Sequence, residues 1–103
     1  MKTFNMRSLI GCNSGNSEFA VKFLYSDVIP ALDKGENIEF DFAGVRLITC
    51  SFGNALFANL LRAKGADVIK RIRITNSNRL VSSEIRWGIA LGEKHLRETG
   101  SAA

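Results

Sequence analysis

The sequence is short of the residue types that build catalytic and metal sites. Its 103 residues include one histidine, two cysteines, one proline and one tryptophan. The single histidine, His95, excludes histidine-rich zinc sites and leaves little room for Ser-His-Asp catalysis. Cys12 and Cys50 form no CxxC pair, which favours reduced thiols in a cytoplasm. No apolar run approaches the ~18 residues of a membrane span, and the first residues lack a signal-peptide pattern. We therefore expect a cytoplasmic protein without a membrane partner.

What remains is an ordinary globular composition. Hydrophobic residues make up 46% of the chain and charged residues 23%, with a formal net charge of +4. The length suits one domain, and the charge permits an acidic partner without requiring one. We expect residues 1–103 to form a single domain with a frayed tail at residues 98–103.

Strands are expected where polar and apolar residues alternate. This pattern occurs at residues 37–42 and 71–75, and the short segment 2–6 is a candidate first strand. Ile38 and Phe40 then share one face of their strand, against a core. The strands are separated by helical patterns, which predicts a sheet covered by helices, because parallel neighbours need crossover connections.

Three helices are expected. Ser17 is a suitable N-cap for the first, and Pro30 should kink or end that helix. Residues 51–64 carry apolar side chains at helical spacing, with Gly65 as C-cap. Asn78 is a suitable cap for the last helix, in which two interior glycines each cost about 1 kcal/mol relative to alanine.

The segment at residues 37–57 carries a resemblance. It reads Asn-Ile-Glu-Phe-Asp-Phe-Ala-Gly-Val-Arg-Leu-Ile-Thr-Cys-Ser-Phe-Gly-Asn-Ala-Leu-Phe. A strand ending in Asp-plus-apolar, a Gly-Val loop and a serine at a helix start resemble the central motif of STAS-type domains. The Ser-Phe pair looks most like the STAS-like family of unknown function, which is related to bacterial anti-sigma factor antagonists. The residue-level match covers about residues 37–61. It implies an α/β sandwich, with an about four-stranded mixed sheet covered by about three helices.

The resemblance also implies a function. In the antagonists, the helix-start serine is phosphorylated by a kinase that is also the binding partner, and that serine aligns with Ser51. Thr49 stands where the antagonists carry aspartate, and Phe52 stands where they carry glycine. The implied function is a non-enzymatic regulatory module without a cofactor that binds a kinase-like or anti-sigma-like protein. The expected partner-binding residues are Thr49, Cys50 and Ser51 at the helix start, together with Asn54, Ala58 and Arg62, which are taken as exposed along the helix.

Two residues at this helix start, Ser51 and Cys50, also suggest roles that do not depend on the resemblance. As a cap, Ser51 would contribute about 1 kcal/mol. As a phosphorylation site it would receive −1.5 to −2 charges at the positive end of a helix. Cys50 at a helix N-terminus is a candidate nucleophile for a small enzyme. No base is evident beside Cys50, so a small buried residue is the expected role.

Three other groups admit a function. Glu39 and Asp41 share a strand face suited to carboxylate chemistry or a hard metal, although Asp41 is also placed to accept a backbone N–H in an Asx turn. The glycine-containing loop at residues 11–17 precedes a helix, as in phosphate-binding loops, but lacks the P-loop ending. The alternative overall function is nucleic-acid binding through the basic stretch from Arg62 to Arg79, which has no aromatic residues for stacking. Its cations are Arg62, Lys64, Lys70, Arg71, Arg73 and Arg79.

Overall fold

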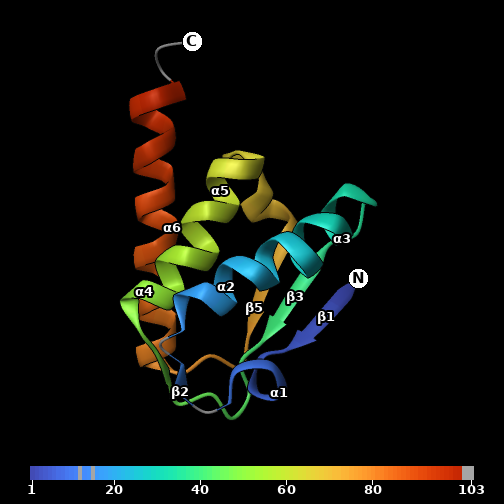
Figure 1. Cartoon of the computed structure of the whole chain (residues 1–103), viewed down its shortest axis with the longest axis vertical. Helices are drawn as coiled ribbons and strands as arrows, with labels where there is room; N and C mark the ends of the chain where they lie inside the picture. Colours follow the sequence, from blue (N-terminus) through green and yellow to red (C-terminus); the bar gives the residue numbers. More distant parts are fainter. Residues whose placement is uncertain (12, 15, 101–103) are drawn as a thin grey trace.

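The computed structural model describes residues 1–11, 13–14 and 16–100. Its central element is a parallel three-stranded sheet in the order β1-β3-β5, formed by β1 (Lys2–Asn5), β3 (Ile38–Asp41) and β5 (Ile72–Thr75) (Figure 1). A separate parallel pair joins β2 (Asn13–Ser14) to β4 (Leu47–Ile48). The expected four-stranded mixed sheet is therefore wrong. Helical segments connect β1 to β3 and β3 to β5, and such crossovers return the chain parallel to its previous strand.

The first helical stretch lies between β1 and β3. A single turn, α1 (Met6–Ile10), comes first, and α2 (Ser17–Phe23), the π-helical η1 (Leu24–Val28) and α3 (Ile29–Asp33) then follow without a break. Asn16 caps α2 by accepting the Phe19 N–H at 3.0 Å, so the expected cap at Ser17 is wrong by one residue. The helix also does not end at Pro30. The π-helical segment ends at Val28, two residues before the proline, and such turns loosen the i→i−4 ladder that a proline interrupts.

The second stretch is α4 (Cys50–Gly53), the π-helical η2 (Asn54–Ala58) and α5 (Asn59–Lys64). Gly65 ends it with a positive φ of 86°, as expected, and a 3-10 helix, η3 (Ala66–Arg71), leads into β5. The last helix, α6 (Arg79–Gly100), is 22 residues long. Asn78 caps α6, as expected, by accepting the Val81 N–H at 2.8 Å. Residues 98–100 continue α6 where a frayed tail was expected, and residues 101–103 lie outside the described part of the chain.

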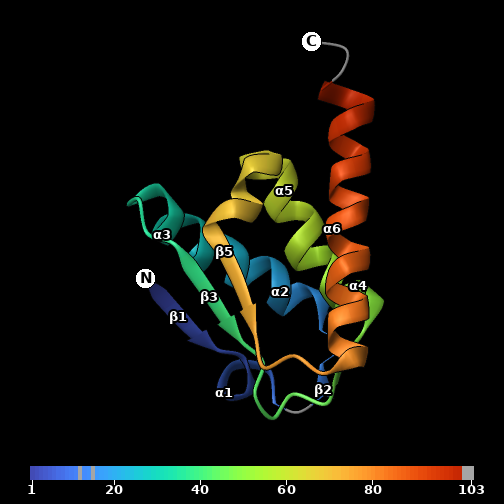
Figure 2. The ribbon, with the colours of Figure 1, turned by 180° about the vertical axis from the view of Figure 1, so that it is seen from behind.

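The sheet has one covered face and one open face. Figure 2 shows the strands with the helices behind them, and within the described residues no helix covers the near face. On the covered face, Phe40 is fully buried between Phe4, Phe23 and Phe57, with ring centroids 6.1, 6.4 and 5.5 Å away. Four aromatic rings thus fix the helical layer on the sheet.

Helix α6 packs on the α4–α5 stretch through glycines. A Cβ at Gly88 would lie 2.7 Å from the carbonyl oxygen of Gly53, and one at Gly92 would lie 3.0 Å from the Cβ of Leu61 and 3.1 Å from the Cα of Ala58. Both glycines are buried. The two glycines lower the helix propensity of α6, but their lack of a side chain allows the two backbones to approach this closely.

Candidate functional site

The candidate site lies where the loop after β3 reaches the first turn of α4 (Figure 1). Loop residues Ala43, Gly44, Arg46 and Leu47 are exposed, and so are Thr49, Cys50 and Ser51. Val45 and Ile48 point into the core, with 3% exposure each. Two buried apolar side chains therefore anchor the loop, and the residues between them are exposed to solvent.

Asp41 fixes the start of this loop. Its Oδ1 accepts the Ala43 N–H at 3.0 Å, which confirms the expected Asx turn, and also accepts the Asn76 side-chain amide at 2.9 Å. The Asn76 hydrogen bond, with the Ala43 backbone bond second, holds the pKa of Asp41 below the ordinary aspartate value. This carboxylate therefore joins the ends of β3 and β5 to the loop.

Asn78 fixes the other side of the loop. Its amide nitrogen donates to the Arg46 carbonyl at 2.8 Å, while its oxygen caps α6. Gly44 completes the turn with a φ of 82°, and a Cβ there would lie 2.6 Å from Cδ of Arg7. Sequence reasoning assigned Asn78 only the helix cap, because the contact with Arg46 spans 32 positions and leaves no local pattern.

The cap of the candidate helix is Thr49 and not Ser51. The Thr49 hydroxyl accepts the Phe52 N–H at 3.2 Å, and α4 begins at Cys50. Ser51 is the second helical residue, and its side chain is exposed. The capping role expected for Ser51 is therefore wrong, which leaves its hydroxyl facing outward beside the positive end of the helix.

Cys50 and Asn54 lie one turn apart on this surface. Cys50 is exposed, so its expected role as buried filler is wrong, and the Asn54 side-chain amide donates to its sulfur at 3.3 Å. Asn54 is half-buried, and its Oδ1 is buried without a hydrogen-bond partner in the described residues. Asn54 is thus less accessible than expected.

The expected surface does not continue along the helix. Ala58 is 5% exposed and lies beneath α6 at Gly92, because the π turn and the glycine contacts bring α6 onto this side of the helix. Arg62, four residues further, is exposed. The structure therefore brings Thr49, Cys50 and Ser51 together and separates them from Arg62 by a covered stretch.

The carboxylate pair of β3 has structural partners. Glu39 accepts the Thr3 hydroxyl at 3.3 Å and the Thr75 hydroxyl at 2.8 Å, which links the three strands across the open face. Within the described residues, no three His, Cys, Asp or Glu side chains come close enough together to hold a metal ion. The pair is therefore accounted for by hydrogen bonds inside the fold.

The glycine-containing loop lies partly outside the described residues, which exclude Cys12 and Gly15. Its described part is strand and cap: Asn13 and Ser14 pair with Leu47 and Ile48, and Asn16 caps α2. This pairing places the loop beside the candidate site. Two-residue strands carry no alternation, so this pairing could not be predicted from a sequence pattern.

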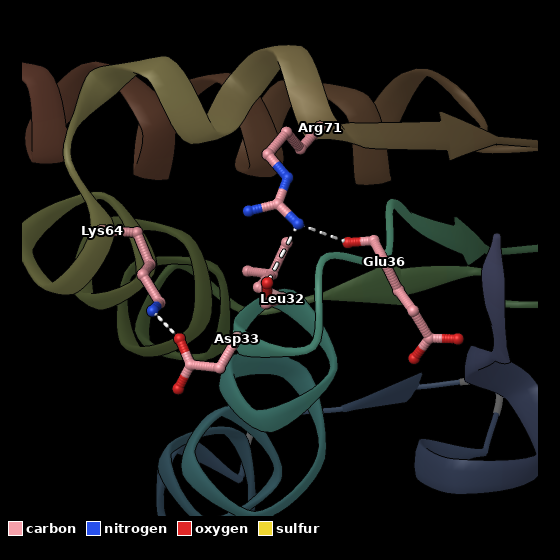
Figure 3. A network of polar contacts seen from close by, with 5 residues as sticks. All are labelled: Leu32, Asp33, Glu36, Lys64 and Arg71. Carbon is pink, nitrogen blue, oxygen red and sulfur yellow. Dashed lines mark hydrogen bonds and ion pairs between the residues drawn. The ribbon is translucent and has the colours of Figure 1, made fainter.

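Part of the basic stretch is engaged in contacts within the domain. Arg71 is half-buried, and its guanidinium donates to the carbonyls of Leu32 at 2.9 Å and Glu36 at 2.8 Å (Figure 3). Lys64 forms an ion pair with Asp33. The remaining cations are exposed but lie on different elements, namely Arg62 on α5, Lys70 on η3, Arg73 on the open face of β5 and Arg79 at the start of α6. Two of the six cations, Lys64 and Arg71, are therefore held by contacts within the domain.

The exposed apolar residues on the outward side of α6 were not predicted from the sequence. Leu80 and Trp87 are 62% and 63% exposed, on a different side of the helix from the buried Val81 and Ile85. Their spacing of seven residues was the available signal. None of the described helices is long and apolar enough to cross a bilayer.

Comparison with known proteins gives one match. A family model described as a STAS-like domain of unknown function (DUF4325) matches residues 22–81, from α2 through the candidate site to the start of α6. No curated protein and no solved structure is similar enough to the chain to count as a match. The expected resemblance to that family is thereby confirmed over more than half of the chain.

Proposed function

The chain belongs to this family of STAS-like domains, and from that premise we propose that it is a non-enzymatic regulatory module that binds a partner protein in the cytoplasm. The proposed docking surface, called here the first-turn surface, comprises Ala43, Gly44, Arg46, Leu47, Thr49, Cys50, Ser51 and Asn54. The proposed partner is a kinase-like or anti-sigma-like protein of a bacterial partner switch. The single observation that carries this is the exposed Ser51 on a pinned loop-to-helix junction.

The pinned loop supports a binding role. Asp41 holds one end of the loop and Asn78 the other, so its exposed residues are presented in one arrangement. A partner then binds without paying for loop ordering, which lowers the entropic cost of association. Leu47, at 40% exposure, gives this surface an apolar contact point.

The position of Ser51 supports a phosphate switch. Its hydroxyl is exposed and makes no capping bond, so a kinase can reach it without opening the helix. A phosphate there would face the positive end of the helix, which the fold tolerates. A partner packed on the same spot would meet −1.5 to −2 added charges that need a matching cation. Phosphorylation would thus change binding without changing the fold.

The experiment is a pull-down from the native organism with wild type and Ser51→Asp, followed by calorimetric titration of each captured protein. Ser51→Asp should fold normally, because acidic residues suit the first turn of a helix. Its affinity should change by about fivefold, or 1 kcal/mol, or more. Ser26→Asp, another exposed serine on a helical stretch, is the matched control and should bind as wild type does.

Two results would end the proposal. One is equal retention of the same partners by wild type and Ser51→Asp, with both proteins folded. The other is tight duplex binding whose affinity falls by about 0.9 log units per log unit of salt for each neutralised phosphate. In that case Arg73→Glu should abolish the binding, and the nucleic-acid alternative would replace the protein-binding one.

A further inference from the structure

The outward side of α6 carries large apolar side chains that the domain itself does not use. Leu80 is 62% exposed and Trp87 63% exposed, and Leu91, one turn further, is half-buried. The side of α6 that faces the core carries Val81 and Ile85, at 0% and 3% exposure. The core of the domain is therefore complete without the outward side, and its apolar residues require a separate explanation.

A hollow on this side has the shape that a second helix fills. Its volume is about 290 Å³, and Arg97 borders it beside Trp87, Ala90, Leu91 and Lys94. Those last four residues stand at positions i, i+3, i+4 and i+7, which is the set that forms a hole for one side chain of a facing helix. The geometry therefore points to a helix as the occupant.

The order of residues along the outward side identifies which helix. Leu80, Glu84, Trp87, Leu91, Lys94 and Glu98 follow one another at spacings of three or four residues. We propose that α6 packs antiparallel on α6 of a second copy of this chain, about a two-fold axis at the level of Ile89. Trp87 of each copy then packs on Leu91 of the other. Glu84 and Lys94 stand five residues to either side of that level, so each Glu84 faces the other copy's Lys94.

Both charged groups lack a strong partner within one copy. Glu84 is half-buried, and its Oε2 is buried without a hydrogen-bond partner in the described residues. Lys94 lies 3.9 Å from Glu98, and both side chains are mostly exposed, with 64% and 59% exposure. Such an exposed pair contributes little. Because Oε2 is covered by the chain's own atoms, the other copy's Lys94 would meet only the exposed part of the Glu84 side chain, and Glu84 would in turn give Lys94 a closer anion.

The border of the apolar strip distinguishes a second copy from a foreign acidic helix. Arg79, Arg86 and Arg97 line one flank, and a two-fold axis places that flank beside the same flank of the other copy. Arg86 then approaches Glu93, which is favourable, and Arg97 approaches Arg79, which is not. Arg97→Glu should therefore strengthen pairing of two copies, whereas it would weaken the docking of an acidic foreign helix.

The test is sedimentation equilibrium of the full chain over a wide concentration range, together with its fluorescence. Trp87 is the only tryptophan, so its emission should shift to the blue as copies pair. Trp87→Ala should weaken self-association by about thirtyfold or more, as expected for a central aromatic anchor. Tyr25→Ala, at an aromatic residue 56% exposed elsewhere, is the matched control and should leave it unchanged.

Charge exchange makes the test specific. Lys94→Glu and Glu84→Lys should each weaken self-association, and an equimolar mixture of the two should restore it as a heterodimer. If Glu84→Lys fails to fold by circular dichroism, Trp87→Lys mixed with Leu91→Glu tests the same register. A chain that stays monomeric throughout, a dimer indifferent to Trp87→Ala, or weaker pairing with Arg97→Glu would overturn the proposal.

Discussion

The helical stretch at residues 50–64 meets its surroundings differently at its start and in its middle. At the start, Cys50 and Ser51 are exposed, while the Thr49 cap and the buried Phe52 hold the turn in place. In the middle, Phe57 and Ala58 are buried between the sheet and α6, where a hypothetical Cβ on Gly92 would already touch Ala58. One helix therefore serves as core and as candidate recognition surface within two turns. The surface ends where α6 begins to cover it.

The largest expected effect lies in the covered middle. Phe57 is fully buried, and its ring centroid lies 5.5 Å from that of Phe40. Phe57→Ala should lower the free energy of unfolding by about 3–5 kcal/mol through lost burial and a cavity. Denaturant melts measure this, with exposed Tyr25→Ala as the control. Similar losses for the two variants would show that the middle is not the core.

The next largest effect tests the close approach of α6. Gly88→Ala places a Cβ 2.7 Å from a backbone oxygen of Gly53, so overpacking should cost about 1–3 kcal/mol despite the better helix propensity of alanine. Ser83→Ala, on an exposed part of the same helix, should be neutral or slightly stabilising. Stabilisation by Gly88→Ala in thermal melts would show that α6 is not seated on Gly53.

A smaller effect separates the two candidate caps at the exposed start. Thr49→Ala removes the acceptor of the Phe52 N–H and should cost about 1 kcal/mol. Ser51→Ala removes no cap and should stay within about 0.5 kcal/mol of wild type. Chemical denaturation of both variants measures the difference. A reversed order would return the cap to Ser51.

The smallest expected effect is a pH dependence at the anchored loop. Because the pKa of Asp41 is lowered in the folded chain, its contribution to stability is present above the ordinary aspartate pKa of about 4. That contribution is lost as pH falls through the lowered value, where the folded chain must take up a proton. Wild type should therefore exceed Asp41→Asn in stability at neutral pH, and the gap should close in acid. A gap that does not change with pH would contradict the role of this carboxylate.

Much of the fold was predictable because its strands carry alternation. Ile38 and Phe40 face the core as expected, Asn78 caps the start of α6, and Gly65 ends α5, both as expected. The error in sheet size came from the resemblance, which implied about four strands, whereas alternation alone predicted strands only where β1, β3 and β5 lie. The packing of α6 was not predicted, because Gly88 and Gly92 taken from the sequence alone only lower helix propensity. The close approach that they allow depends on residues of the α4–α5 stretch, which are distant in the sequence.

The candidate site was predictable only in its local part. The Gly-Val loop and the helix start follow from neighbouring residues, and the structure places Thr49, Cys50 and Ser51 together. The exposure of Ala58 was wrong because it depends on α6, more than twenty residues later in the chain. The exposure of Cys50 was wrong for a related reason: a residue type sets only an average burial, and packing decides each case.

The contacts of Arg71 limit which positive charges of this protein can be reversed without damage to the fold. The Arg71 guanidinium donates to the Leu32 and Glu36 carbonyls at the end of α3, so Arg71 links the end of η3 to the first helical stretch. Arg71→Glu would place a carboxylate against two carbonyl oxygens and so disrupt the structure. In a binding experiment, that loss of structure would look the same as the loss of a residue that contacts the ligand. Arg71→Lys would also loosen this link, because one ammonium cannot reproduce the planar fork. Arg73, two residues on and exposed, is the position at which charge can be reversed without opening the fold.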